Sequence, residues 1–338
     1  MKRIIAALLA MTLTLSFAFM MSSCAKDENL QDEQEIENGI DVTDVVDAND
    51  ADDVSGEVIS GVLPVKDIAG NDIVVPDSIE KIIVASPQIT EMLVAIGLGD
   101  KIAAIDAYSV GLEGIKTELP IFDLMSPDNE RILEIEPDII FATTMIQADG
   151  LEPLYAIKQA GICVVYLPTP DDIKGIKESI LFVGAVTKND EKANEMVSAM
   201  EAEIAKIAEI GATVTEKKSV YFEISAAPYM YSLGTGVYLN EMIELTGAVN
   251  IFADKNGWLA VDTEMLFNGN PDVILTNVNY LEDPIGEILA RENWGSITAV
   301  QNGEVYQISN NPSSLANQNI VIALKEIAKA VYPDLYVD

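Results

Sequence analysis

The residue types present in this chain limit the chemistry that it can perform. The 338 residues contain no histidine, which excludes imidazole acid–base catalysis, triads that use histidine and most zinc centres. No G-x-S-x-G, Walker or G-x-G-x-x-G motif occurs. Composition alone leaves a Ser–Lys pair or paired carboxylates open. We therefore expect a protein that binds a ligand rather than an enzyme, with no catalytic residue and no metal-binding cluster.

Two pairs of glutamates stand at matching places in an internal repeat. Glu130 and Glu264 each precede a Pro-Asp pair by seven residues, and an apolar run follows both. Earlier in each half, Glu91 and Glu241 are each followed by Met and stand six residues before a glycine. The matched order indicates one supersecondary unit that occurs twice, with a short helix that ends before proline and leads into a buried strand. In isolation, Glu130 and Glu264 would be ordinary acids at helix N-termini, where the helix dipole favours them.

Short apolar, β-branched runs alternate with amphipathic stretches. The expected strands cover 81–86, 101–107, 139–143, 163–167, 219–225, 273–276 and 305–308. The expected helices include 90–96, 129–135, 152–160 and 173–186. This alternation is typical of βαβ units, so the sequence predicts an α/β fold with mainly parallel sheets and helices on both faces.

A longer helix is predicted between the two halves. The segment 189–211 has apolar residues at helical spacing and no internal breaker; Asn189 or Asp190 can cap its start, and Gly211 stands at its end. We therefore predict an N-terminal lobe at 62–188, a rigid bridging helix at 189–211 and a C-terminal lobe at 212–338.

The loops that follow the expected strands supply candidate ligand-binding residues, because ligands of open α/β sheets bind beyond the carboxyl ends of the strands. Aromatic faces in these loops suit a large, flat and partly apolar ligand. Any one of the aromatic residues could instead belong to the core. The candidates for ligand binding are Ser86, Gln88, Tyr108, Met145, Tyr229, Tyr231 and Trp258.

The N-terminal residues have the pattern of an export signal. Lys2 and Arg3 precede an apolar stretch, and Met21-Ser22-Ser23-Cys24 follows it. The last four residues resemble the lipobox of bacterial lipoproteins, with Met21 in place of the usual Leu. The resemblance implies a signal peptide at 1–23 and a lipid on Cys24 at the extracytoplasmic face of the cytoplasmic membrane. An uncleaved membrane anchor is the alternative, at the lower limit of length for a bilayer span.

Composition separates the next segment from the lobes. Residues 25–61 are rich in Asp and Glu and hold no aromatic residue, which predicts that 24–61 form an acidic, disordered tether. The whole chain has a formal net charge of −35, so we expect no nucleic-acid partner. Besides Cys24 there is one cysteine, Cys163, inside an apolar run, and it is expected to be a buried small hydrophobe.

Motifs in both lobes resemble one family of proteins. Segments 65–76, 81–91 and 97–102 of the first lobe, and 250–253, 257–258, 270–275 and 293–306 of the second, are similar to the periplasmic-binding-protein family that serves ABC importers of ferric siderophores, haem and cobalamin. The match covers about 62–333. It implies a ligand cleft between two lobes, and partners in a permease dimer with its ATPase, to which one exposed acid of each lobe docks. Glu130 and Glu264 are at the matching positions.

The resemblance also narrows the ligand. Tyr108 and Trp258 match positions that line the cobalamin site in the family. Beyond Arg3, the chain has only Arg131 and Arg291, and an arginine cluster would be the natural partner of an anionic catecholate chelate. We therefore expect a monomeric lipoprotein that captures a corrinoid such as cobalamin, or a hydroxamate-type ferric siderophore. Haem with Tyr108 or Met145 as an axial ligand is an alternative, and a surface interaction protein or an enzyme are rival classes.

Overall fold

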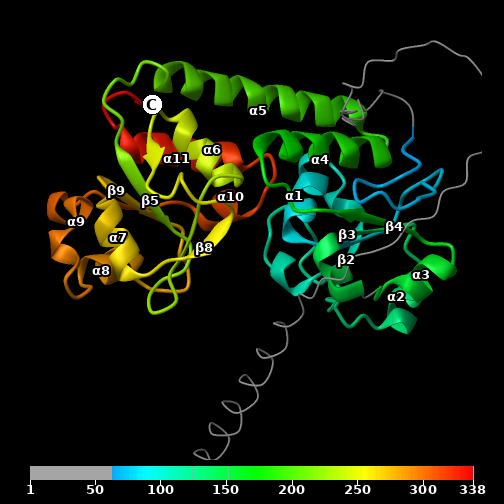
Figure 1. Ribbon diagram of the computed structural model, residues 1–338. Helices are drawn as coiled ribbons and strands as arrows, with labels where there is room; N and C mark the ends of the chain where they lie inside the picture. The colour runs from blue at the N-terminus through cyan, green and yellow to red at the C-terminus, as the bar shows by residue number, and fades with distance from the viewer. Residues whose placement is uncertain (1–62, 124, 151, 338) are drawn as a thin grey trace, which may run out of the picture. The chain divides into compact units, whose positions relative to one another are not determined.

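The computed structural model describes residues 63–123, 125–150 and 152–337 (Figure 1). In the N-terminal lobe, four parallel strands lie in the order β2-β1-β3-β4. In the C-terminal lobe, four parallel strands lie in the order β10-β9-β5-β7. The strands are β1 Ile82–Ala85, β2 Ile102–Ile105, β3 Ile139–Thr143, β4 Cys163–Leu167, β5 Ser219–Glu223, β7 Val249–Asn250, β9 Val273–Thr276 and β10 Val305–Gln307.

The two sheets have the same topology. If the strands of each lobe are numbered along the chain, with the small sheet of β6 (Tyr231–Leu233) and β8 (Trp258–Ala260) left aside, both sheets read second, first, third, fourth. The repeated glycines explain part of the sequence match, because Gly97 and Gly247 follow the equivalent helices α1 (Pro87–Ala95) and α6 (Tyr238–Leu245) with φ of +87° and +90°. A residue without a side chain adopts this left-handed conformation at helix ends at little cost. The internal repeat predicted from the glutamates is therefore confirmed.

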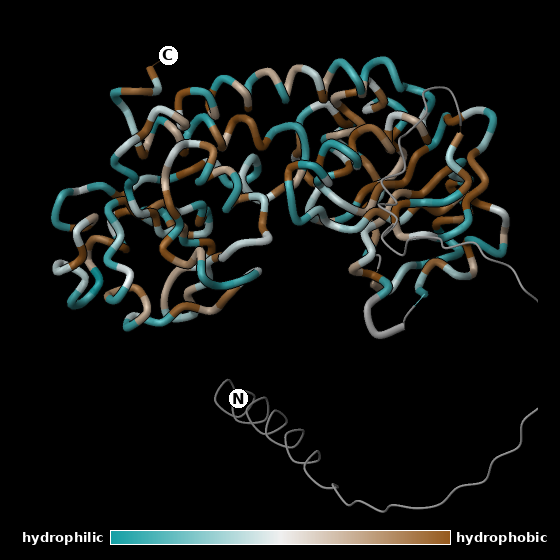
Figure 2. The backbone as a smooth tube through the Cα atoms, turned by 45° about the horizontal axis from the view of Figure 1, so that its top comes forward, coloured by the Kyte–Doolittle hydropathy of each residue, from teal (hydrophilic) through white to brown (hydrophobic). Residues whose placement is uncertain are grey.

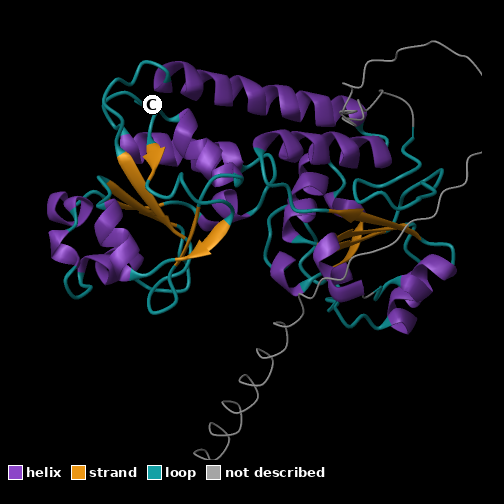
Figure 3. Cartoon of the chain, viewed as in Figure 1, coloured by secondary structure: helices purple, strands orange, loops and turns teal. Residues whose placement is uncertain are grey.

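Helices lie over both faces of each sheet (Figure 3). The N-terminal lobe contains α1 Pro87–Ala95, α2 Asn129–Ile135, α3 Tyr155–Gln159 and α4 Ile173–Val186. The 22-residue helix α5, Asp190–Gly211, then leads to the second lobe. That lobe contains α6 Tyr238–Leu245, α7 Thr263–Gly269, α8 Pro284–Leu289, α9 Thr298–Asn302, α10 Asn310–Ser314 and α11 Ile320–Val331.

The core follows the period of two that strands impose on side chains. In β1, Ile82 and Val84 belong to one apolar cluster, and Ile83 belongs to another on the opposite face. The first cluster also contains Phe222 of β5 and Met200 of α5, so one apolar cluster includes residues of both sheets and of the bridging helix. Figure 2 shows hydrophobic segments of the backbone gathered in the interior of the lobes.

The bridging helix packs against helices of both lobes. α5 contacts α4 of the first lobe and α6 and α11 of the second. Its last residue, Gly211, allows a close approach, because a Cβ there would lie 2.2 Å from the carbonyl oxygen of Leu245. The expected α/β fold with two mainly parallel sheets and a long bridging helix is confirmed.

One part of the predicted secondary structure is wrong. The segments around Tyr231 and Trp258 were expected to be loops, but Tyr231–Leu233 forms β6 and Trp258–Ala260 forms β8, which pair antiparallel. Each strand has three residues, too few for an apolar pattern that sequence analysis could detect.

The N-terminal predictions fall outside this structure. The signal at 1–23, Cys24 and the tether to 61 lie outside the described residues. Within the residues that are described, no helix has the length and apolar character needed to cross a membrane.

Candidate functional site

Tyr108 lies on a short turn that two other side chains hold in place. The turn, Ala107–Ser109, follows β2 and is capped by the carboxylate of Asp106, which accepts from the backbone N–H of Ser109 at 3.1 Å and from its hydroxyl. The Ser109 hydroxyl also lies 3.1 Å from Thr90 Oγ1 in α1. Both Thr90 and Ser109 are buried, whereas Tyr108 is 85 % exposed. The turn therefore presents an aromatic ring to solvent from a fixed backbone.

Two of the residues that were predicted to bind ligand lie in the interior of the first lobe. Ser86 and Gln88 are buried, at 4 % and 6 % exposure. Ser86 stands just before α1, and its carbonyl accepts from the N–H and hydroxyl of Thr90, both at 2.9 Å. In this structure Ser86 supports the start of α1, and Gln88 lies buried in its first turn.

Met145 is the remaining candidate in the first lobe. It lies in the 3₁₀ segment Thr144–Gly150 that follows β3, and 70 % of it is exposed. β3 and β2 both flank β1 in a parallel sheet, so Met145 and Tyr108 leave the sheet at the same edge, the carboxyl ends of the strands.

The second lobe brings two candidates together on one small sheet. In the β6–β8 pair, Tyr231 lies opposite Ala260 and Leu233 lies opposite Trp258. Residues opposite each other, and residues two apart along a strand, share a face. Tyr231 and Trp258 are therefore diagonal neighbours on one face, and both are exposed. Tyr229 precedes β6 and is 81 % exposed.

The structure adds an aromatic residue that the sequence analysis missed. Tyr280 follows β9, the neighbour of β5, and its ring is 63 % exposed. Its hydroxyl accepts from the backbone N–H of Ala226 at 2.8 Å, so it holds the loop that carries Tyr229. In the sequence, the only sign of a role for Tyr280 is its position shortly after an expected strand. Its hydrogen-bond partner Ala226 lies 54 residues away in the chain, so no local pattern connects the two.

Arg291 and Glu223 form a buried ion pair that contacts Met230, the neighbour of Tyr229 in this loop. Arg291 donates to both carboxylate oxygens of Glu223, at 2.6 and 2.7 Å, and to Glu287 on α8. It also stacks over Trp294, with 4.3 Å from the guanidinium carbon to the ring centroid, and its Nη1 lies 3.4 Å from the sulfur of Met230. Burial alone would lower the pKa of Arg291, but the hydrogen bonds with Glu223 and Glu287 outweigh it and raise the pKa. Arg291 is thus a fixed cation inside the lobe.

Both arginines of the described residues have partners within their own lobe. Arg291 is used by the two carboxylates, and Arg131 on α2 lies over the ring of Phe122, with 5.2 Å to the centroid. Arg291 is consequently not available to pair with an anionic ligand. Among the described residues, no group of three or more Cys, Asp or Glu side chains is placed to hold a metal ion.

The two predicted docking acids occupy equivalent helices. Glu130 lies in the first turn of α2, which Asp128 caps by accepting from the Arg131 N–H at 3.1 Å. Glu264 lies in the first turn of α7, which Asp262 caps by accepting from the Met265 N–H at 2.8 Å. Both glutamates are exposed. The repeat thus presents one acid per lobe at the same place in the unit.

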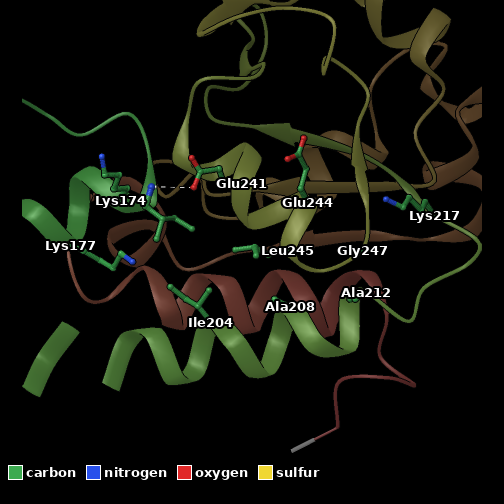
Figure 4. A pocket seen from close by; sticks show the side chains of 12 residues that line it. Lys174, Lys177, Ile204, Ala208, Ala212, Lys217, Glu241, Glu244, Leu245 and Gly247 are labelled. Atoms are coloured by element: carbon green, nitrogen blue, oxygen red, sulfur yellow. Dashed lines mark hydrogen bonds between the residues drawn. The ribbon is translucent and has the colours of Figure 1, made fainter. Parts of the chain in front are cut away.

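A hollow of about 570 Å³ lies elsewhere, between α4, α5 and α6 (Figure 4). None of the predicted ligand-binding residues lines it, and its lining contains no aromatic side chain. Its wall contains apolar residues such as Ile204, Ala208 and Leu245, together with three lysines and two glutamates. A flat conjugated ligand would find no ring to stack on there.

Two parallel sheets of one topology, a bridging helix and exposed aromatic loops at the strand ends define a two-lobed binding protein. Residues 82–312 match the family described as periplasmic binding protein, and the chain belongs to that family. It is a substrate-binding protein of an ABC transporter, a class that works with a membrane permease and its ATPase and performs no catalysis.

Individual relatives agree with this assignment. The chain is 26 % identical to the uncharacterized ABC transporter substrate-binding lipoprotein YvrC of Bacillus subtilis, over 80 % of this chain and 86 % of the relative. It is 28 % identical to a vitamin B12-binding protein of Yersinia pestis, over 59 % of this chain and 69 % of the relative. A periplasmic solute-binding protein of Staphylococcus epidermidis, whose crystal structure is described as that of a possible iron-binding protein, superposes with a TM-score of 0.67 at 26 % identity, over 75 % of this chain and 99 % of that one.

Proposed function

We propose that this protein captures a corrinoid such as cobalamin and delivers it to the permease of its ABC importer. A hydroxamate-type ferric siderophore is the second candidate. The ligand is held by Tyr108 and Met145 in segments that follow strands of the first lobe, and by Tyr229, Tyr231 and Trp258 of the second lobe, where Tyr231 and Trp258 lie on the β6–β8 pair.

The observation that carries this proposal is the combination of exposed rings in the C-terminal lobe with an arginine that two carboxylates already bind. Tyr231 and Trp258 share one face of a small sheet, and Tyr280 holds the neighbouring loop. Rings of this kind stack on flat or apolar ligand surfaces. The one arginine of this lobe is neutralised by Glu223 and Glu287, so a highly anionic catecholate would lack its bidentate partner. The similarity to a vitamin B12-binding protein supports the same ligand class.

Delivery is proposed to occur through Glu130 and Glu264. Each is exposed in the first turn of a capped helix, and the two helices are equivalent in the repeat. Acids presented by both lobes would meet basic residues of a permease dimer, and such contacts provide orientation and salt-sensitive association.

Attachment to the membrane completes the proposal. Cys24 would carry the lipid, and residues 25–61 would separate the lobes from the bilayer while keeping them near the permease at high local concentration. The similarity to a lipoprotein of Bacillus subtilis supports this anchor. Mass spectrometry of the membrane-extracted protein tests it, since a diacylglyceryl group on Cys24 is expected.

Isothermal titration with four probes tests the ligand. Cyanocobalamin, a ferric hydroxamate, a ferric catecholate and haemin are titrated into the protein. We expect one-site binding that is tightest for cyanocobalamin, with the hydroxamate second. Binding that is tightest for the catecholate, or binding of none of the four, would overturn the proposal. Tightest binding of haemin would assign the site to haem, with the exposed Tyr108 or Met145 as the axial ligand.

A further inference from the structure

The repeat-related glutamates Glu91 and Glu241 have an unexpected common feature. Glu91 lies on α1 of the first lobe and Glu241 on α6 of the second. Each carboxylate accepts hydrogen bonds from the opposite lobe. Each lobe thus contributes one glutamate, at the same position of the repeat, to a contact between the lobes.

Glu91 binds the segment just before α11. Its carboxylate accepts from the side-chain amides of Asn317, at 2.7 Å, and Asn319, at 2.9 Å. Asn317 is fully buried and also orders this segment, because its Oδ1 accepts from the Asn319 N–H at 2.9 Å. The Gln318 amide adds a weaker bond to the Glu91 carbonyl at 3.3 Å. One carboxylate of the first lobe therefore fixes the start of the last helix of the second lobe.

Glu241 makes the reciprocal contact. Its carboxylate accepts from the backbone N–H of Ile173 at 3.2 Å, the first residue of α4 (the dashed line at Glu241 in Figure 4). The N–H groups of a first turn have no partner within the helix, and the dipole favours a negative charge there. Asp172 satisfies the Gly175 N–H from within the lobe, at 2.6 Å. The other lobe therefore completes the cap of α4.

The two contacts between the lobes are of the same chemical kind. In each case a carboxylate at the same position of the repeat reaches the N-terminal end of a helix that belongs to the other lobe. Partial burial raises the pKa of Glu241, and the Ile173 N–H opposes this shift. The hollow beside Glu241 leaves room between α4 and α6, with Ile173, Glu241 and Glu244 on its walls. The lobes can therefore change their separation there once the hydrogen bond breaks.

We propose that Glu91 and Glu241 are positioning residues that hold the two lobes at a fixed separation and so preorganise the ligand-binding loops. Loss of both contacts frees the lobes to move about α5, and the binding-competent arrangement becomes a fraction of the population. Apparent affinity falls in proportion to that fraction. This effect on affinity rests on the proposed function, whereas the effect on lobe separation does not.

The test measures the distance between the lobes without any ligand. Spin labels on Glu118→Cys and Glu282→Cys, both at exposed positions, report the separation by double electron–electron resonance. The variant that combines Glu91→Ala with Glu241→Ala is expected to give a broader distance distribution than the parent. The matched control combines Glu195→Ala with Glu209→Ala, exposed acids of α5 for which the structure shows no hydrogen bond or ion pair. It removes the same charge and is expected to keep the parent distribution.

An unchanged distribution in the Glu91→Ala and Glu241→Ala variant would overturn the proposal, as would equal broadening in the control. If the double variant does not fold, each single variant carries the test, with a smaller broadening expected from each and no broadening in either as the contradictory result. Titration of cyanocobalamin into the same proteins is expected to show affinity about tenfold lower in the double variant. Broadening without binding of any chelate would sink the proposed ligand and leave the positioning role intact.

Discussion

The guanidinium of Arg291 and the carboxylate of Glu223 form two parallel hydrogen bonds, at 2.6 and 2.7 Å, inside the C-terminal lobe. The side chains are 7 % and 1 % exposed. Planar pairs of this kind are strong and directional. The pair fixes the end of β5, and through Met230 it supports the loop that carries Tyr229 and leads into β6.

Breaking this pair should destabilise the protein strongly. Glu223→Gln leaves a buried guanidinium without its main counter-charge, which typically costs about 3–5 kcal/mol in unfolding free energy. Chemical denaturation followed by circular dichroism measures it. Glu282→Gln, at an exposed position, is the control and should leave the unfolding free energy unchanged. Equal unfolding free energies for Glu223→Gln and Glu282→Gln would show that the ion pair does not stabilise the fold.

The aromatic face of the β6–β8 sheet should contribute directly to ligand binding. Tyr231→Ala and Trp258→Ala each remove an exposed ring, and aromatic contacts of this kind often contribute about 1–2 kcal/mol, or roughly tenfold or more in affinity. Isothermal titration with cyanocobalamin measures the change. Tyr155→Ala removes an exposed ring at the start of α3 that is not among the proposed ligand-binding residues, and it should not alter the affinity. Loss of affinity in the control but not in the two variants would place the ligand elsewhere.

Glu130 and Glu264 should matter for delivery and not for capture. The double variant Glu130→Ala with Glu264→Ala is expected to bind cyanocobalamin as the parent does, because neither side chain is among the proposed ligand-binding residues. Corrinoid uptake by cells that depend on this protein should fall at least about tenfold, which corresponds to about 1.4 kcal/mol of lost docking energy. Glu118→Ala with Glu134→Ala removes two other exposed acids and serves as the charge-matched control. Undiminished uptake in the docking variant would refute the assignment.

Cys163 should be chemically silent in the folded protein. Burial in β4 raises the pKa of its thiol to about 11, so at pH 8 almost no thiolate is present to attack an alkylating reagent. In a Cys24→Ser variant, a maleimide is expected to label the protein only after denaturant unfolds it. Labelling within minutes under native conditions would show that the N-terminal lobe opens readily at β4.

The sequence predicted the long buried strands more accurately than the short strands β6 and β8. The bounds of β3, β4 and β9 were predicted to the residue, because fully buried parallel strands are continuous apolar runs. α4 was predicted with the same accuracy. β6 and β8 escaped prediction since three residues carry no period, and Gly234, Gly236 and Gly257 around them indicated only turns.

The site was less predictable than the fold for a different reason. Position after a strand identified Tyr108, Tyr229 and Trp258 as surface aromatics, and all three are exposed. The same rule included Ser86 and Gln88, which the structure buries because α1 begins immediately after β1. Tertiary packing brings together partners such as Glu223 and Arg291, which are 68 residues apart in the chain. Local sequence patterns carry no information about such pairs.

Hydrogen–deuterium exchange with and without cyanocobalamin tests the central claim most directly. If the ligand binds at the segments that follow the parallel strands and on the β6–β8 pair, amide exchange should slow in the peptides that cover 106–109, 143–147, 225–231 and 257–260, which belong to both lobes. The account predicts protection of these peptides at saturating ligand. Protection confined to the helices around the hollow of α4, α5 and α6, or no protection at any site, would contradict it.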